Sequence, residues 1–471
     1  MNYKGILFFL GIYSIIISFF SFINILYSIY FNSTPGFNLY LAPLLISLVL
    51  GVIFCLTGKN HTKNIFIYDQ ILLILVSFIF LPFLICLPYY FSIHDLGLLN
   101  SYFESISGFT TTSFSIFNDL QIIDEPLLLW RSSSRWIGGL LFLIAIIGTL
   151  GTKRIKIKPI YLISGVSLGG NFYNDFYSNF IKVLLIYFFT TIFVVFLYGL
   201  VDIRFFDSFN LALTTVSSGG FLSKNNLSDI TTNNFQIFVL SITLLIPIFN
   251  FYLLVKIFTR QFKIQDYQED LHLGIFIITL TLFFYFFVIS NEGIADVFLA
   301  VTSSISTSGI STYSSNYDLS LFLILLTIIG GSLLSTSSGL KYIRFYILLK
   351  ISYQEIYKLV KPKNIFNNNL FRSEIKITDE DSKISFLIFI SFIIAVFILT
   401  AALTLDNLSF ENSFKLAILT LTNTAATSLY DLENLNFFDL SSFTKIILMI
   451  FMIFGKIEII AVLFLFSKRF F

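Results

Sequence analysis

The chain contains four short stretches built to one pattern: SYFESISGFTTTS (101–113), SFNLALTTVSSGG (208–220), VFLAVTSSISTSG (297–309) and SFKLAILTLTNTA (413–425). Each combines short apolar runs with small polar residues, and each precedes a long apolar segment. Aligned without gaps, all four end on a small residue. Four such polar loops inside a very apolar chain predict the lining of a pore, in which backbone carbonyl groups surround a cation.

The overall composition is typical of a membrane protein. Of the 471 residues, 56% are hydrophobic and only 12% are charged, whereas soluble domains carry roughly 25% charged residues. So much apolar surface predicts a multi-pass protein of the cell membrane, in contact with the lipid bilayer. The sequence has no phosphate-binding loop, dinucleotide fingerprint or nucleophile elbow. We therefore expect neither an enzyme nor a partner of nucleic acid.

Ten apolar segments approach or exceed the roughly 20 residues that a helix needs to cross the hydrocarbon. They are 5–31, 38–57, 66–92, 127–151, 178–201, 233–258, 273–291, 319–350, 384–405 and 441–467. The four repeated stretches lie between the third and fourth, fifth and sixth, seventh and eighth, and ninth and tenth of these segments. At about 12 residues each they are too short to cross, so we predict re-entrant half-helices followed by extended loops.

The predicted fold is an all-α integral membrane protein, with two leading helices and four helix–pore-loop–helix units around a pseudo-fourfold pore. We divide the chain into a two-helix leader (1–65), repeat 1 (66–158), repeat 2 (159–265), repeat 3 with a gating loop (266–352), a cytoplasmic connector (353–383) and repeat 4 (384–471). The distribution of charged residues between the connecting segments agrees with this topology when the N-terminus lies on the cytoplasmic side. The inner connections carry most lysines and arginines, whereas the outer ones carry mainly aspartates and glutamates.

The predicted ion-binding filter is formed by the last three residues of each aligned stretch. These residues are Thr111, Thr112 and Ser113; Ser218, Gly219 and Gly220; Thr307, Ser308 and Gly309; and Asn423, Thr424 and Ala425. Turning carbonyl groups inward requires some positive φ angles, which glycine adopts without steric cost. Gly220 and Gly309 suit this role, whereas a Cβ atom at Ser113 or Ala425 costs about 1–2 kcal/mol.

Neutral carbonyl and hydroxyl oxygens favour K⁺ or Na⁺ as the bound ion, because Ca²⁺ calls for carboxylates and only Glu104 lies within the four stretches. Close helix packing through small residues is the alternative explanation of one such stretch. Four stretches in register, each at the same place in a helix–loop–helix unit, favour the pore.

Two further features are predicted to form a gate on the inner side. The stretch GGSLLSTSSGLK (330–341), here called the gating segment, interrupts the eighth apolar segment with small residues. Unwound backbone at this depth is tolerated where it lines a cavity. The gate residues are predicted to be Gly330, Gly331, Ser335, Thr336, Ser337, Ser338, Gly339, Lys341 and Lys456.

Lys456 lies with Glu458 in the apolar run FGKIEI of the last segment, where an intramembrane charge marks the transport path. We expect it to act as an electrostatic barrier below the filter. The alternatives are a kinked packing helix for the gating segment and, for Lys456, a structural pair with Glu458 or with a loop near the inner interface.

Four motifs carry a resemblance to a known family: SGFTTT (107–112), WRSSSRWIGG (130–139), GGSLLSTSSGLK (330–341) and GKIE (455–458). Over almost its whole length the chain resembles the Trk/Ktr/HKT superfamily of potassium transporters, in particular the bacterial membrane subunit. The resemblance implies K⁺ uptake, a homodimer, and a cytoplasmic RCK-type regulatory subunit that binds the nucleotide. No organic cofactor is then expected on this chain.

The sequence departs from the family at the filter, where only two of the four final positions are glycine. Plant relatives with serine in the first repeat tend to admit Na⁺, so a Na⁺-permeating or Na⁺-coupled transporter is the main alternative. A secondary transporter of an organic solute would require two inverted halves. A non-transporting structural protein would tolerate bulky or charged residues in the four loops. The four parallel units with small residues disfavour both.

Overall fold

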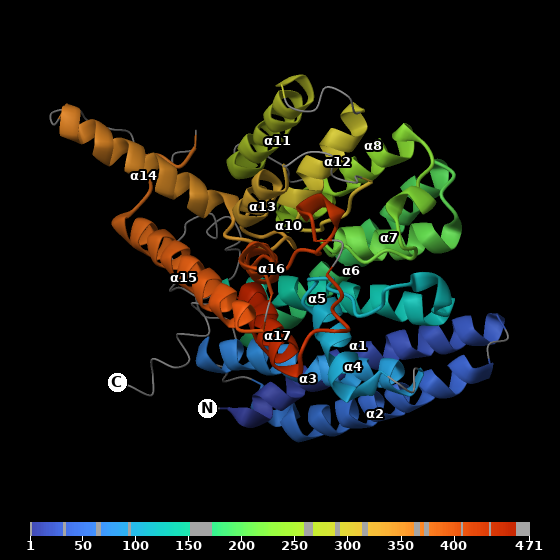
Figure 1. Ribbon diagram of the computed structural model, residues 1–471. Helices are drawn as coiled ribbons and strands as arrows, with labels where there is room; N and C mark the ends of the chain where they lie inside the picture. The colour runs from blue at the N-terminus through green and yellow to red at the C-terminus, as the bar shows by residue number, and fades with distance from the viewer. Residues whose placement is uncertain are drawn as a thin grey trace.

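The chain is folded almost entirely into helices. The computed structural model describes residues 2–31, 34–62, 67–92, 96–150, 172–258, 267–287, 293–312, 319–361, 368–371, 376–406, 408–432 and 435–457. Within these ranges the one β interaction is an isolated bridge between Asn369 and Lys376. The predicted all-α fold is confirmed. Figure 1 shows the two leader helices, α1 (Tyr3–Tyr30) and α2 (Thr34–Gly58), side by side along one edge of the molecule.

Six of the described helices are long and apolar enough to cross a membrane. They are α1, α2, α3 (Ile67–Ser92), α6 (Phe172–Leu200), α11 (Gln268–Phe287) and α15 (Asp379–Thr404). Large apolar side chains remain exposed along them; Phe196 is 62% exposed and Ile398 is 57% exposed. Only lipid can cover so much apolar surface at low cost, so the chain is a multi-pass membrane protein.

Two other long helices complete repeats 1 and 4. Helix α5 (Glu125–Leu150) has the length of a span but carries the polar run RSSSR at 131–135. Helix α17 (Ser442–Ile457) ends at the last described residue. The remaining part of the tenth predicted segment, including Glu458, lies outside the described residues.

Two of the ten predicted spans are not continuous helices. The eighth consists of α13 (Ser320–Ile329), the irregular gating segment and α14 (Tyr342–Val360), as the run of small residues predicts. The sixth, predicted as one helix over 233–258, is instead divided into α8 (Asn234–Thr243), α9 (Leu245–Ile248) and α10 (Phe251–Phe258). That prediction was wrong because the helix breaks at Phe249, whose ψ of 162° is extended. The flanking residues Pro247, Ile248 and Phe251 bond instead to the backbone of repeat 3.

The four short helices are present where the repeats predict them. They are α4 (Gly97–Phe109), α7 (Phe205–Val216), α12 (Ile294–Ile305) and α16 (Phe410–Leu421). At about 1.5 Å per residue each is roughly 18–20 Å long, well short of a hydrocarbon core of about 30 Å. Each is largely buried among the long helices, so its non-helical continuation is covered by protein and not by lipid.

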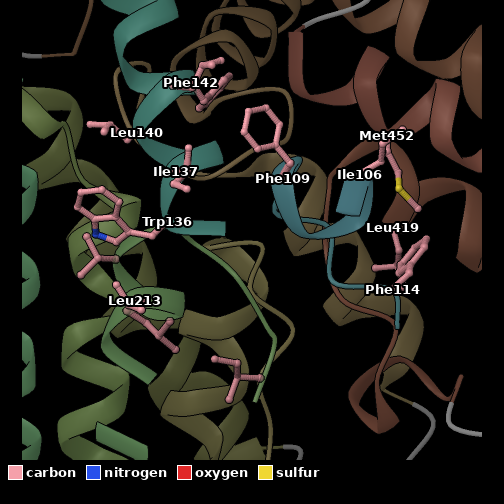
Figure 2. Packing of buried hydrophobic residues seen from close by; sticks show 14 of the residues in the cluster. Ile106, Phe109, Phe114, Trp136, Ile137, Leu140, Phe142, Leu213, Leu419 and Met452 are labelled. Carbon is pink, nitrogen blue, oxygen red and sulfur yellow. The ribbon is translucent and has the colours of Figure 1, made fainter. Parts of the chain in front are cut away.

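The core between repeats 1 and 4 brings the short helices against the helices that follow them. Figure 2 shows Ile106 and Phe109 of α4 with Ile137 and Phe142 of α5, and Leu419 and Met452 beside Phe114. Two glycines allow the closest approach. A Cβ atom at Gly138 would overlap the carbonyl group of Phe109, and one at Gly455 would overlap that of Leu421. Phe109 and Leu421 occupy the same aligned position, so the two repeats pack alike.

Replacing Gly138 with alanine should therefore destabilise the protein. The new methyl group would meet backbone, which cannot move aside as a side chain can, and overpacking of this kind costs about 1–3 kcal/mol. We expect Gly138→Ala to lower the melting temperature of the purified protein in detergent. Gly199→Ala is the matched control, because a Cβ atom there meets nothing within 4 Å. Equal melting temperatures for the two variants would contradict the close contact.

Candidate functional site

All four short helices end in the same hydrogen-bonded turn. In repeat 1 the N–H of Thr111 donates to the carbonyl of Gly108 at 2.9 Å, and the N–H of Thr112 donates to that of Ser107 at 3.0 Å. The corresponding pairs are Ser218–Thr215 (3.1 Å) and Gly219–Thr214 (2.7 Å), Thr307–Ser304 (3.1 Å) and Ser308–Ser303 (3.0 Å), and Asn423–Thr420 (3.2 Å) and Thr424–Leu419 (2.9 Å). This pairing is the Schellman motif of helix C-termini. The loops that follow, 110–113, 217–220, 306–309 and 422–425, are called loops 1 to 4 below.

The turn places one left-handed residue at the same aligned position of every loop. The φ angles are 64° at Thr111, 60° at Ser218, 60° at Thr307 and 50° at Asn423. Glycine usually occupies this position of the motif because it has no Cβ atom. A residue with a side chain costs about 1–2 kcal/mol there. All four repeats accept this strain, so the surrounding contacts must hold the turn in place.

The final positions of the loops fall into two pairs. Ser113 and Gly309 have positive φ angles, 70° and 71°, whereas Gly220 and Ala425 do not. The prediction that Gly220 supplies a positive φ angle is therefore wrong, and Ser113 adopts one despite its side chain. Gly220 is needed for space: a Cβ atom would overlap the carbonyl of Ser308 and lie 2.7 Å from the Cβ atom of Ala425. Loops 2, 3 and 4 meet at this point.

The side chains of the left-handed residues bind the surroundings of the loops. Ser218 Oγ donates to the carbonyl of Thr336 at 3.0 Å, and Thr307 Oγ1 accepts from the N–H of Ser338 at 3.1 Å. These two bonds join loops 2 and 3 directly to the gating segment. In repeat 4, Asn423 Nδ2 donates to Thr112 Oγ1 at 2.9 Å, which joins loop 4 to loop 1. The same group also donates to the carbonyl of Met452 at 2.8 Å.

Lys456 connects loop 1 to the gating segment. Its Nζ donates to Thr111 Oγ1 at 2.7 Å, to Ser338 Oγ at 3.1 Å and to the carbonyl of Thr336 at 3.3 Å. The side chain is only 1% exposed, and its Nζ lies 4.3 Å from the ring centroid of Phe142. The structure thus brings this predicted gate residue together with one predicted filter residue and two residues of the gating segment.

The gating segment is a compact loop closed on itself. The N–H of Leu340 donates to the carbonyl of Ile328 at 2.9 Å, and that of Tyr342 to Gly331 at 3.0 Å. Lys341 Nζ donates to the carbonyls of Ser337 and Ser335 at 2.5 and 3.2 Å. Positive φ angles at Gly330 (64°) and Gly339 (81°) allow its two ends to cross closely. Within the loop, Ser337 Oγ accepts from the N–H of Gly331 at 3.0 Å.

The broken sixth span anchors the gating segment, a contact that the sequence analysis missed. The carbonyl of Ile248 accepts from the N–H of Ser332 at 2.8 Å, and that of Pro247 accepts from Ser337 at 3.2 Å. In return, the N–H of Phe251 donates to the carbonyl of Leu334 at 2.9 Å. Backbone groups freed by the break are therefore satisfied by the interrupted span of repeat 3. Pro247 in the middle of the apolar run was the one local signal.

Two acidic residues at the start of α11 strengthen this anchor. Glu269 Oε1 accepts from the N–H of Leu333 at 3.1 Å, and Asp270 Oδ1 accepts from that of Asn250 at 2.9 Å. Both carboxylates are buried. The sequence shows them only as acidic residues before an apolar segment, which is typical of a helix N-terminus.

Carboxylates in the first turns of α7 and α12 also accept hydrogen bonds from nearby residues. Asp207 Oδ1 accepts from Ser223 Oγ at 2.6 Å, and Asp296 Oδ1 from Thr312 Oγ1 at 2.7 Å. These pairs lie at the same aligned positions of repeats 2 and 3 and tie each returning chain to the first turn of its short helix. Further out, hydrogen bonds from the Asn225 side chain and from the backbone of Gln121 hold the pKa of Asp119 below its usual value.

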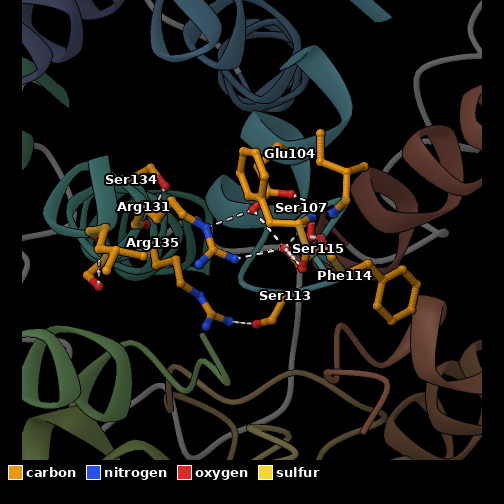
Figure 3. Close-up of polar contacts among 12 residues, drawn as sticks. Glu104, Ser107, Ser113, Phe114, Ser115, Arg131, Ser134 and Arg135 are labelled. Atoms are coloured by element: carbon orange, nitrogen blue, oxygen red, sulfur yellow. Dashed lines mark hydrogen bonds and ion pairs between the residues drawn. The ribbon is translucent and has the colours of Figure 1, made fainter. Parts of the chain in front are cut away.

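Two arginines on α5 approach loop 1, and the sequence analysis did not assign them a role. Arg131 Nε forms an ion pair with Glu104 Oε1 at 2.9 Å, and Glu104 Oε2 also accepts from the N–H of Ile116 at 2.9 Å (Figure 3). The one carboxylate of the four stretches is therefore used within repeat 1. Arg135 instead donates to the carbonyl of Thr111 at 2.8 Å and to Ser113 Oγ. Both guanidinium groups are buried.

The chain is similar to several known transport proteins, although no protein-family model matches it. It is 27% identical over 364 residues to an uncharacterized cation transporter, MJ1485, of Methanocaldococcus jannaschii, covering 77% of this chain and 75% of that protein. It is 25% identical over 395 residues to the Trk system potassium uptake protein TrkG of Escherichia coli, covering 80% and 79% of the two chains. It is 24% identical over 445 residues to TrkH of Salmonella typhimurium, covering 90% of each.

The fold agrees with these relationships. The crystal structure of the potassium transporter TrkH from Vibrio parahaemolyticus superposes on the chain with a TM-score of 0.86, covering 99% of this chain and 98% of that one at 19% identity. The sequence relatives and the shared fold point to one family, the same one that the four sequence motifs indicate. In sequence and in fold, this multi-pass membrane chain is therefore similar to the membrane subunits of Trk potassium uptake systems.

Proposed function

We propose that the chain mediates uptake of K⁺ through a pore whose selectivity filter is formed by loops 1 to 4. The observation that carries this proposal is the Schellman turn at the end of all four short helices, with its left-handed residue at the same aligned position. The names of the sequence relatives, Trk system potassium uptake proteins, support K⁺ as the transported ion.

Physical chemistry favours a cation in these loops. Each loop begins where a helix ends, so the negative end of the helix dipole lies beside it. A left-handed residue within a short run of other conformations reorients successive carbonyl groups. The predicted filter residues provide backbone carbonyls, and most of them also carry hydroxyl or amide oxygens. A monovalent cation needs no more than such neutral ligands, whereas a divalent one calls for carboxylates.

A Na⁺-permeating or Na⁺-coupled transporter with weak K⁺ selectivity is the second candidate. The observation that favours it is Ser113, which has a φ angle of 70° although it carries a side chain. The same aligned position of loop 3 has nearly the same φ angle but is a glycine, Gly309. The strain and the hydroxyl make loop 1 unlike loop 3. A ring of unequal loops can discriminate less sharply between ions of similar charge.

We also propose that the gating segment and Lys456 close the pore below the filter. The segment contacts loops 2 and 3 directly and loop 1 through Lys456. Moving it would break these bonds and release the buried ammonium group of Lys456, on α17, from two of its three hydrogen-bond partners. The anchoring bonds to Ile248 and Glu269 define the closed position that such a movement would leave.

The assembly follows from the resemblance to the family. We propose a homodimer that works with a cytoplasmic RCK-type subunit, which binds the regulatory nucleotide. The connector contacts the gating segment: Phe371 stacks on Tyr346 at 4.2 Å between ring centroids and packs in one apolar cluster with Leu333 of that segment. A signal from such a subunit would have a short path to the gate.

Rubidium uptake tests the proposed function. We expect the chain to restore growth of a K⁺-uptake-deficient bacterium at low K⁺ and to carry ⁸⁶Rb⁺ into proteoliposomes, because its four loops accept a large monovalent cation. Measuring ²²Na⁺ uptake in the same vesicles separates the two candidates. Sodium flux without rescue at low K⁺ would overturn K⁺ uptake and favour the second candidate.

Ser113→Gly should raise the permeability of K⁺ relative to Na⁺ severalfold. Glycine removes a strain of about 1–2 kcal/mol at this left-handed position and makes loop 1 match loop 3. Ser113→Ala is the matched control, because it removes the hydroxyl but keeps the Cβ atom. We expect only the glycine variant to sharpen selectivity in reconstituted liposomes. An unchanged permeability ratio in Ser113→Gly would count against the filter assignment.

Lys456→Ala should increase the ion flux by a factor of roughly 2–10. The substitution removes a buried charge and all three bonds that connect loop 1 to the gating segment. Lys456→Arg keeps the charge and should stay near the parent rate, and Lys358→Ala changes an exposed lysine remote from the gate. A lower or equal flux in Lys456→Ala at matched protein levels would show that Lys456 is not a barrier.

A further inference from the structure

Arg135 is a buried cation whose charge has no acidic hydrogen-bond partner. Its side chain is 0% exposed, and neither Nε nor Nη1 has a hydrogen-bond partner among the described residues. The neighbouring arginine one turn earlier, Arg131, is paired with Glu104. Arg131 therefore belongs to an ion pair, whereas Arg135 brings into the protein a charge without a direct acidic partner among the described residues, which is costly to bury.

The guanidinium of Arg135 lies where loops 1 and 2 meet. Its Nη2 donates to the carbonyl of Thr111 at 2.8 Å and to Ser113 Oγ, and Ser113 Oγ also accepts from the N–H of Gly220 at 3.1 Å. On the side of loop 2, a Cβ atom at Gly219 would overlap the guanidinium. A side chain at Gly219 would therefore require the guanidinium of Arg135 to move.

An aromatic ring fixes the guanidinium in this place. The Cζ atom of Arg135 lies 4.6 Å from the ring centroid of Phe221, directly after loop 2, and that of Arg131 lies 4.1 Å from the same ring. A cation beside an aromatic face is attracted by the ring quadrupole. Phe221 thereby holds both arginines, and the charge of Arg135 stays beside the carbonyl of Thr111.

The proposed filter gives this position a consequence, so the inference rests on the proposed function. A cation bound by the carbonyl oxygen of Thr111 would lie within about 6 Å of the Arg135 charge, a distance at which like charges repel strongly in a protein interior. The hydrogen bond also withdraws part of the electron density of that oxygen. We propose that Arg135 is a tethered cation that lowers the affinity of the filter for monovalent cations and so sets the concentration at which transport saturates.

Arg135→Gln and Arg135→Lys test this proposal. Glutamine removes the charge and keeps an amide donor for the Thr111 carbonyl, whereas lysine keeps the charge and loses the planar fork. In proteoliposomes we expect Arg135→Gln to lower the KM for ⁸⁶Rb⁺ by roughly tenfold, since one unit charge at this distance is removed. Arg135→Lys should stay within about threefold of the parent by the same reasoning.

Arg204→Gln is the matched control, because it removes an exposed arginine that pairs with Glu125 away from the loops. Its KM should not change. Stabilisation of the purified variants by RbCl, compared with choline chloride, gives the affinity without transport. The midpoint for Arg135→Gln should shift to lower concentration by the same factor.

Three outcomes would overturn the proposal. A KM and a midpoint for Arg135→Gln within twofold of the parent would show that the charge does not act on the ion. Equal changes in Arg135→Gln and Arg135→Lys would assign the effect to the lost fork, and hence to loop geometry alone. If neither the parent nor Arg135→Gln took up or bound Rb⁺, the proposed function would fail and this inference with it; uptake by the parent with an unchanged Arg135→Gln removes only the role of Arg135.

Discussion

The left-handed turn after each short helix is the constraint on which the rest of the site depends. A helix that stops inside a membrane leaves backbone groups that no water can satisfy. The Schellman pairing satisfies part of them, but it forces Thr111 and its three equivalents into a conformation that a side chain resists. The side chains of these residues then bind the gating segment, Lys456 or the next loop. Contacts with the gating segment, with Lys456 and between the loops thus hold the strained residues of the four loops.

This arrangement links elements that are far apart in the sequence. The breaks in the sixth and eighth spans satisfy each other's backbone groups. The carbonyls of Pro247 and Ile248 accept from N–H groups of the gating segment, and the carbonyl of Leu334 accepts from the N–H of Phe251. The gating segment also forms hydrogen bonds with Ser218 of loop 2 and Thr307 of loop 3. A movement of the gating segment would therefore change the contacts of the left-handed residues, so the segment and the loops are physically linked.

Charged side chains are unevenly distributed among the four loops. Repeat 1 contains Glu104 and both arginines of α5, and Lys456 reaches the same loop from repeat 4. Thr111 consequently meets a lysine at its hydroxyl and an arginine at its carbonyl, whereas its equivalents meet only neutral groups in their hydrogen bonds. Loop 1 is where positive charge concentrates, and it is also where Ser113 replaces the glycine found in loop 3. Both features distinguish loop 1 from the other three loops.

The sequence by itself determined the helical membrane fold, the four short helices and the interruption at 330–341, because length, hydropathy and runs of small residues are local properties of the chain. It also placed Lys456 and the gating segment at one site. Only the tertiary structure decided which loop positions are left-handed, that Gly220 is required for space, and that the sixth span breaks at Phe249. It alone placed Arg135 at loop 1. The last three of these depend on partners more than 20 residues away in the chain, and a local pattern carries no information about which backbone groups or charges will meet there. The left-handed position follows from local bonds, but none of its four residues is a glycine that would mark it in the sequence.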